Sequence, residues 1–128
     1  MQEIYDFLKK CGVFYLATVD GDHPRVRPMG AFNVFEEKLY IETGKGKNVA
    51  TQMVINPKIE ICAYDGKGEW IRIQAVAVQD ERAEPKQSML DAFPMLEDMY
   101  KGNFDVLYLK DVLATFFSFT DEPKTVKF

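Results

Sequence analysis

Apolar residues recur along this chain with two different periods, and the changes of period separate helices from strands. Four apolar residues near the N-terminus have helical spacing: Ile4, Phe7, Leu8 and Cys11. They predict a short amphipathic helix, and Gly12 follows it as a C-terminal cap. Residues 13–19 are rich in β-branched and aromatic side chains and end at the turn signal Asp20-Gly21, which is typical of a strand.

Alternating apolar and polar positions predict further strands at residues 25–35, 38–43, 58–64, 70–78 and 112–119. A helix carrying Val49, Met53 and Val54 on one face is expected to end before Pro57. Residues 84–100 have a helical pattern that Pro94 interrupts. Six strands joined mostly by tight turns, with a few short helices, predict a closed or nearly closed antiparallel barrel.

Length and composition predict one globular domain. The chain has 128 residues, of which 47% are hydrophobic, and no apolar run approaches the roughly 20 residues that span a bilayer. Acidic residues in the first six positions argue against a signal peptide, so a cytoplasmic protein is expected. Cys11 and Cys62 have no CxxC spacing and lie among apolar neighbours, which favours reduced, buried thiols.

The distribution of charge is more informative than its sum. The chain has 16 Lys and Arg against 20 Asp and Glu, for a net charge of -4, which argues against non-specific nucleic-acid binding. Cations nevertheless gather in two short segments, PRVRP at residues 24–28 and GKGKN at residues 44–48. Such local clusters on an acidic chain indicate an anion site, as a phosphate-bearing ligand requires.

In the PRVRP segment, strand geometry sends Arg25 and Arg27 to one face, roughly 7 Å apart. Two guanidinium groups at that spacing suit one phosphate or one planar heterocycle. The flanking prolines lack N–H groups, which predicts an edge strand or a bulge. The alternative is that both arginines lie on a solvated face and pair with surface carboxylates.

In the GKGKN segment, glycines allow backbone N–H groups to converge where a helix begins, and the lysines add charge. The alternative is a solvated turn between strand and helix. The two segments taken together favour the phosphate interpretation.

The chain has few residues that could form other kinds of catalytic site or a metal site. His23 is the only histidine, so histidine-based triads and multi-histidine metal sites are not expected, and no metal site is predicted. A nucleophilic thiol is not expected from either cysteine. These absences favour a protein that obtains its chemistry from a cofactor. Trp70, the only tryptophan, either stacks on a planar ligand or caps one end of the barrel.

The order of these segments resembles the pyridoxamine 5′-phosphate oxidase-like FMN-binding split barrels over essentially the whole chain. The resemblance rests on the opening helix and on FYLATVDGDHPRVRPMG, KLYIETGKGKN, NPKIEIC and EWIRIQAVAV. The small branch that includes the nitroimidazole-resistance proteins is the most similar. The resemblance implies a mainly β fold, a six-stranded antiparallel split barrel of Greek-key type in one domain (residues 1–128), and a homodimer with FMN at the interface.

By position, the resemblance also implies a set of FMN-binding residues. The flavin ring and ribityl chain would be lined by Arg25, Val26, Arg27, Pro28 and Met29. On the adjacent strand this lining would continue with Glu42 and Thr43. Lys45, Lys47 and Asn48 would bind the phosphate, and Trp70 would contact the flavin. No side chain stands out as a catalytic acid or base.

The function implied is an FMN-dependent oxidoreductase that acts on an unidentified small molecule or electron donor. Three alternatives remain open at this level. The protein could bind or sense a flavin or haem without turnover, it could use a deazaflavin in place of FMN, or it could be a dimeric module without a cofactor.

Overall fold

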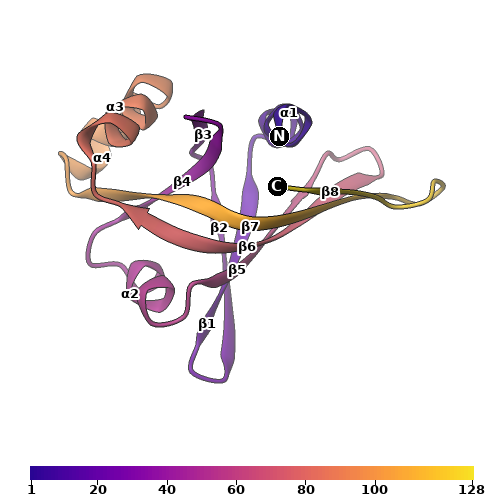
Figure 1. Ribbon diagram of the computed structural model, residues 1–128, viewed down its shortest axis with the longest axis horizontal. Coiled ribbons are helices and arrows are strands. Elements are labelled where there is room, and N and C mark those ends of the chain that lie inside the picture. The colour runs from indigo at the N-terminus through magenta and orange to yellow at the C-terminus, as the bar shows by residue number, and fades with distance from the viewer.

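A computed structural model describes all 128 residues, Met1–Phe128, and has a mainly β architecture with four short helices (Figure 1). The strands are β1 (Phe14–Asp20), β2 (His23–Met29), β3 (Phe32–Phe35), β4 (Lys38–Gly44), β5 (Lys58–Tyr64), β6 (Glu69–Asp80), β7 (Phe104–Ser118) and β8 (Lys124–Lys127). The helices are α1 (Gln2–Cys11), α2 (Asn48–Ile55), α3 (Ala83–Ala92) and α4 (Met95–Tyr100). None of the helices is long and apolar enough to cross a membrane.

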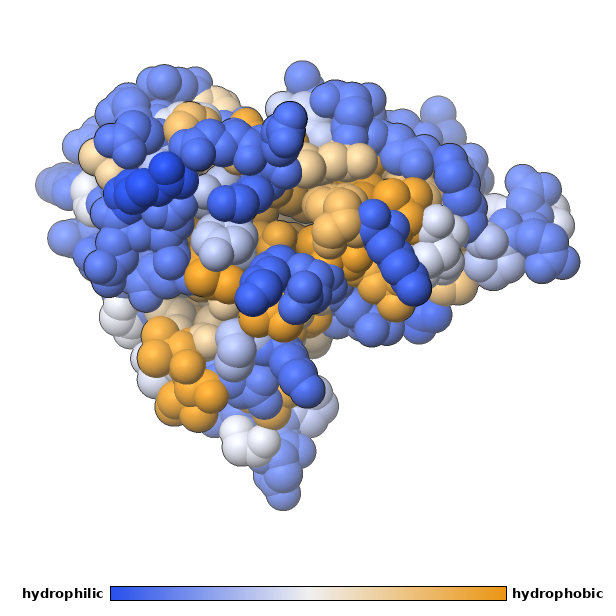
Figure 2. Space-filling view, viewed as in Figure 1, coloured by the Kyte–Doolittle hydropathy of each residue, from blue (hydrophilic) through white to orange (hydrophobic).

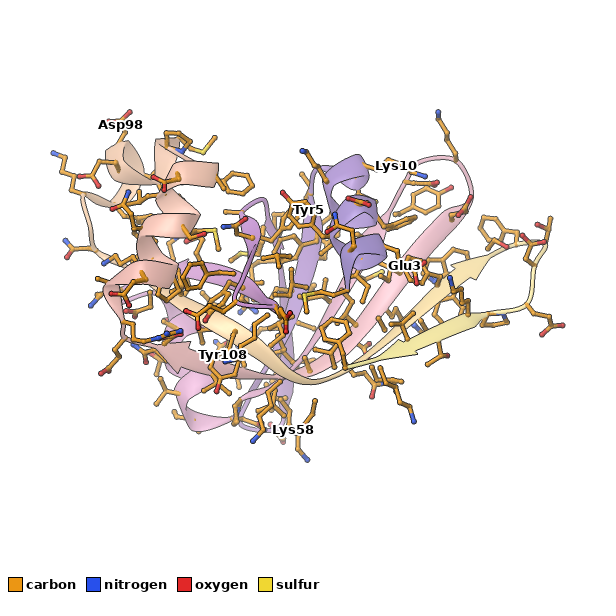
Figure 3. The ribbon with its side chains drawn as sticks, turned by 45° about the horizontal axis from the view of Figure 1, so that its top comes forward. Glu3, Tyr5, Lys10, Lys58, Asp98 and Tyr108 are labelled. Atoms are coloured by element: carbon orange, nitrogen blue, oxygen red, sulfur yellow. The ribbon has the colours of Figure 1, made fainter.

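Helix α1 confirms the expected amphipathic helix. It buries Ile4, Phe7 and Leu8 and ends at Cys11. Gly12 follows as the cap, and its φ of 81° places the backbone in the left-handed region. The Gly12 N–H donates to the Leu8 carbonyl over 2.9 Å. Lys10 near the end of α1 forms an ion pair with Asp65 in the β5–β6 turn, with 3.4 Å between the charged atoms (Figure 3). The helix is thereby attached to the sheet at both its apolar face and its C-terminus.

All strands belong to one antiparallel sheet, in the order β2-β1-β5-β6-β7-β4-β3, with β8 added alongside β7. The end strands β2 and β3 have no ladder between them, so the sheet is not closed and the fold is a split β-barrel. Strand β2 pairs only with β1, which confirms the edge position that Pro24 and Pro28 predicted.

The structure has eight strands, whereas six were expected. The run predicted at residues 25–35 divides into β2 and β3 around Gly30, and β8 was missed. The last long strand also begins at Phe104, before the expected residue 112. It carries an irregularity at Asp111, whose φ is 54°, where the register with β6 shifts between Gln74 and Val76. This irregularity breaks the alternation that would have revealed the first half of β7.

The two faces of β4 belong to different apolar clusters. Leu39 and Ile41 point into the main core inside the barrel, which also receives α1 and α2. Tyr40 points the other way, into a smaller cluster with residues of α3, α4 and β7 such as Met89 and Leu96. Because successive strand residues alternate, Glu42 lies on the face covered by α3 and α4, and Thr43 lies on the barrel face.

Candidate functional site

A groove of about 760 Å³ lies where the barrel is open, between the end of β2 and the end of β4. We call it the seam groove, and it is lined by residues 27–30, 42–43, 46–49 and 99–100. These segments come from β2, β4, the turn into α2, and the C-terminal end of α4. The volume is in the range of about 300 to 1,000 Å³ that is usual for small-molecule sites.

The register of the strands explains why the groove exists. The β3–β4 ladder ends at the Phe32–Ile41 pair, whereas β4 continues to Gly44 and pairs there only with β7. The far side of β4 beyond Ile41 therefore has no strand beside it. Since β2 also has one free side, the groove is bounded by two strand edges whose backbone groups are not used by the sheet.

Arg27 enters the groove from β2 and is fixed by hydrogen bonds. Its guanidinium donates to Thr18 Oγ1 over 2.7 Å, to Gln52 Oε1 over 2.9 Å and to the Leu16 carbonyl over 3.2 Å. The Thr18 hydroxyl donates in turn to Gln52 Oε1 over 2.5 Å. Burial, with a smaller contribution from Arg25, lowers the pKa of Arg27 from its ordinary value. The result is a cation with a fixed position and orientation.

Lys47 enters the same groove from the turn before α2. Its Nζ donates to the Tyr100 hydroxyl over 2.9 Å and lies 5.1 Å from the centre of that ring. Helix α2 begins at Asn48, and no side chain caps its N-terminus. The first N–H groups of a helix have no partner within the helix and carry a partial positive charge. The ammonium group and the helix N-terminus together form a suitable anion site.

Two glycines make the turn before α2 possible. Gly46 has a φ of 81°, which side-chain-bearing residues rarely adopt. Gly44 allows α4 to approach β4, because a Cβ at that position would lie 2.5 Å from Cε1 of Tyr100. Tyr100 and Met99 thereby form the wall of the groove that α4 contributes.

Glu42 is the one acidic residue in the groove lining, and it is only 6% exposed. Its Oε2 is buried and has no hydrogen-bond partner, and no other buried side-chain oxygen or nitrogen of the chain lacks one. Burial raises the pKa of Glu42 to about 6, against an opposing effect of Lys47. The groove therefore contains a carboxyl group that the protein itself leaves unsatisfied.

The structure brings together most of the residues that sequence comparison predicted for FMN. Seven of them line the seam groove: Arg27, Pro28, Met29, Glu42, Thr43, Lys47 and Asn48. Three neighbours in the same segments do not. Arg25 forms an exposed ion pair with Asp20 (3.3 Å), Lys45 forms one with Asp105 (3.4 Å), and Val26 is 69% exposed.

Trp70 also lies outside the seam groove. Its ring stacks on Phe117 with 5.4 Å between centroids and 10° between planes, and Phe119 packs beside it. The guanidinium of Arg72 lies 4.5 Å from the centre of the Phe117 ring. Within one chain, this arrangement fits the alternative interpretation, in which the tryptophan caps one end of the barrel.

Sequence reasoning missed the residues that position the predicted ones. Thr18 and Gln52 orient Arg27, and Tyr100 orients Lys47. Gln52 is separated from Arg27 by 25 positions and Tyr100 from Lys47 by 53, so no local spacing could have linked them. The only available signals were a polar Thr18 within an apolar strand and a glutamine on the apolar face of a helix.

The groove residues fit a phosphate-bearing planar ligand such as FMN. Lys47 and the N-terminus of α2 suit a phosphate, whereas Pro28 and Met29 offer an apolar surface to a ring. The Glu42 carboxyl, which the protein leaves partly unsatisfied, suits a polar group of the ligand. The fit therefore rests on anion-binding, apolar and hydrogen-bonding features that line one groove.

Comparisons with known proteins show the family and the fold of the chain. The profile of the pyridoxamine 5′-phosphate oxidase family matches residues 1–126. A solved NimC/NimA family protein from Clostridium acetobutylicum is 45% identical, with a TM-score of 0.95 over 100% of this chain and 92% of that one. No curated protein matches the sequence.

More distant structures share the fold alone. A putative pyridoxamine 5′-phosphate oxidase from Listeria innocua is 22% identical, with a TM-score of 0.69 over 98% of this chain and 95% of that one. The haem storage protein HutZ from Vibrio cholerae is 22% identical, with a TM-score of 0.66 over 85% of this chain and 87% of that one. The split barrel is thus common to proteins whose names refer to different ligands.

Proposed function

Because this chain belongs to the pyridoxamine 5′-phosphate oxidase family, we propose that its seam groove binds FMN and that the protein is an FMN-dependent oxidoreductase acting on a small molecule. The observation that carries the proposal is the pairing of Lys47 with the uncapped N-terminus of α2 in one groove with Arg27. Bound FMN would supply the exchange of electrons or hydride with the substrate.

The protein's own contribution is binding and orientation. Lys47, Asn48 and the first N–H groups of α2 hold the phosphate, and Pro28 and Met29 support the ring. Arg27 provides a fixed positive charge, because Thr18 and Gln52 hold its guanidinium in one orientation. Fixed charges and hydrogen-bond donors can tune a redox cofactor without further reorganisation.

A homodimer with FMN at the interface is part of the proposal, and exposed apolar side chains support it. Val54 and Ile55 on α2 are 73% and 78% exposed. Figure 2 shows apolar surface in the region that α2 occupies in Figure 1. Tyr15 and Tyr64, on β1 and β5, are about half exposed at 48% and 51%. Since Trp70 does not line the groove of its own chain, its contact with FMN would be made to the partner subunit's groove.

A second candidate is a flavin- or haem-binding protein without turnover. One observation favours it, the fold shared with the haem storage protein HutZ.

Anaerobic reduction of the FMN-loaded protein by NADH or NADPH distinguishes the two candidates. The oxidoreductase predicts bleaching of the flavin absorbance within seconds to minutes, followed by reoxidation when an electron acceptor such as a nitroaromatic compound is added. Stable oxidised flavin with every donor, or a Soret band and no flavin affinity, would favour the binding protein instead.

A further inference from the structure

The Glu42 carboxyl is in an environment that suits its neutral form better than its charged form. The side chain is 6% exposed, and Oε2 has no donor within hydrogen-bond distance. An ionised carboxylate loses its hydration when it is buried and needs several donors to replace it. Here the protein supplies none to Oε2, and the Glu42 side chain is one of those that line the seam groove.

The groups around Glu42 come from four elements. Lys47, in the turn before α2, is the charged group that acts on the carboxyl. Arg27 of β2 and the Tyr100 hydroxyl of α4 line the same groove, but both are already hydrogen-bonded to other partners. On β7 the residue opposite Glu42 is the apolar Val106. Lys47 is therefore the one charged group that offsets the free-energy cost of ionising the buried carboxyl.

An anion bound at Lys47 changes this balance. The anion pairs with the Lys47 ammonium group, so this group offsets less of the cost of ionising Glu42. The anion also adds negative charge beside the carboxyl. Both effects favour the neutral carboxyl, because a like charge nearby disfavours ionisation. A neutral carboxyl is also a hydrogen-bond donor, whereas a carboxylate can only accept.

We propose that Glu42 is a ligand contact that takes up a proton as the phosphate-bearing ligand binds and donates a hydrogen bond to that ligand. The proposal rests on the function proposed above, in which the ligand is FMN. In this state the carboxyl gains a hydrogen-bond partner that the protein does not provide. Binding is then coupled to pH through one residue of the groove.

The pKa of about 6 sets the size of the coupling. At pH 7 the free carboxyl is about one-tenth protonated, so a ligand that holds it neutral takes up nearly one proton, roughly 0.9. Between pH 7 and 8 the affinity for FMN then falls nearly tenfold. In this window a phosphate whose second pKa lies near 6 is at least about nine-tenths dianionic, so the charge of the ligand is nearly constant.

Isothermal titration of the full chain with FMN, in buffers of different ionisation enthalpy, measures the proton uptake. The wild type is expected to take up nearly one proton at pH 7, and Glu42→Gln none. The amide keeps a donor and cannot ionise, so the variant should bind FMN about tenfold more tightly than the wild type at pH 7 and show no loss of affinity up to pH 8.

Two further variants separate the roles of charge and hydrogen bonding. Glu42→Leu removes the donor as well as the charge, and it is expected to bind FMN more weakly than Glu42→Gln at every pH. Glu122→Gln makes the same chemical change at an exposed position outside the groove, and it should retain the proton uptake of the wild type.

The outcomes are distinguishable. FMN binding by the wild type without proton uptake, or equal pH dependence in wild type and Glu42→Gln, overturns the role of Glu42 and leaves the FMN site intact. Failure of the wild type and of Glu42→Gln to bind FMN at any pH between 5.5 and 8 overturns both proposals.

Discussion

The Lys47 ammonium group donates a hydrogen bond of 2.9 Å to the hydroxyl of Tyr100, which joins the turn before α2 to the end of α4. The two residues are 53 positions apart, yet they meet because Gly44 lets the tyrosine ring approach β4. The contact holds the lysine over the groove before any ligand arrives. Such preorganisation lowers the entropy that a ligand must lose on binding.

Replacing Arg27 and Lys47 together by alanine is expected to weaken FMN binding by at least a hundredfold. Each cation is fixed in the seam groove, and a hydrogen bond to a charged group contributes about 1.5 to 3 kcal/mol. Fluorescence titration with FMN measures the effect.

The matched control is the double variant Arg25→Ala and Lys45→Ala, which removes the same two residue types from the same two segments. These side chains form ion pairs with Asp20 and Asp105 and do not line the groove, so FMN affinity should change by less than about fivefold. Equal losses in the two double variants would contradict the assignment of the groove.

Tyr100→Phe tests the contact that positions Lys47. The variant keeps the ring against Gly44 and removes only the hydroxyl, so the fold should be unaffected. Affinity for FMN is expected to fall about threefold to tenfold, corresponding to a net hydrogen bond of about 1 kcal/mol. An unchanged affinity would mean that Lys47 needs no support from α4.

Gly44→Ala should destabilise the protein by about 1 to 3 kcal/mol, because its Cβ would lie 2.5 Å from Tyr100 Cε1 and force the end of α4 to move. Urea denaturation gives the free energy of unfolding. Gly30→Ala is the comparison, since nothing lies within 4 Å of a Cβ there. Similar stabilities of the two variants would show that α4 does not depend on the close approach.

The raised pKa of Glu42 predicts how its replacement affects stability. In the unfolded chain the group titrates near 4.5, and in the folded protein at about 6. The folded state therefore binds the proton more tightly, and the stability contributed by the neutral form is present below pH 4.5 and lost as the pH rises to about 6. That loss amounts to about 2 kcal/mol.

Glu42→Gln cannot ionise and avoids this loss. The difference in free energy of unfolding between the variant and the wild type should be about 2 kcal/mol more favourable to the variant at pH 7 than at pH 4. Urea denaturation at the two pH values measures the difference. A constant difference between the two proteins would show that Glu42 titrates normally.

Local patterns were sufficient to predict much of the fold. The apolar face of α1 with Gly12 behind it, the helix that ends before Pro57, and the edge position of β2 all follow from residues close together in sequence. The first half of β7 was missed because the irregularity at Asp111 disrupts the alternation. Strand β8 was missed because its four residues have no distinctive pattern.

The candidate site was predictable only in part, for a related reason. The cations Arg27 and Lys47 stand out by composition, but Arg25 and Lys45 have the same local context and differ only in their tertiary partners. The roles of Thr18, Gln52 and Tyr100 depend on contacts between distant segments. Burial of Glu42 follows from α3 and α4 covering its face of β4, which no pattern around residue 42 indicates.

The most direct test of the central claim is a visible absorbance and fluorescence titration of the purified wild-type protein with FMN. The account predicts a saturable change in the flavin spectrum with one FMN bound per chain. A spectrum that remains that of free FMN at every protein concentration would contradict the claim that the seam groove is a flavin site.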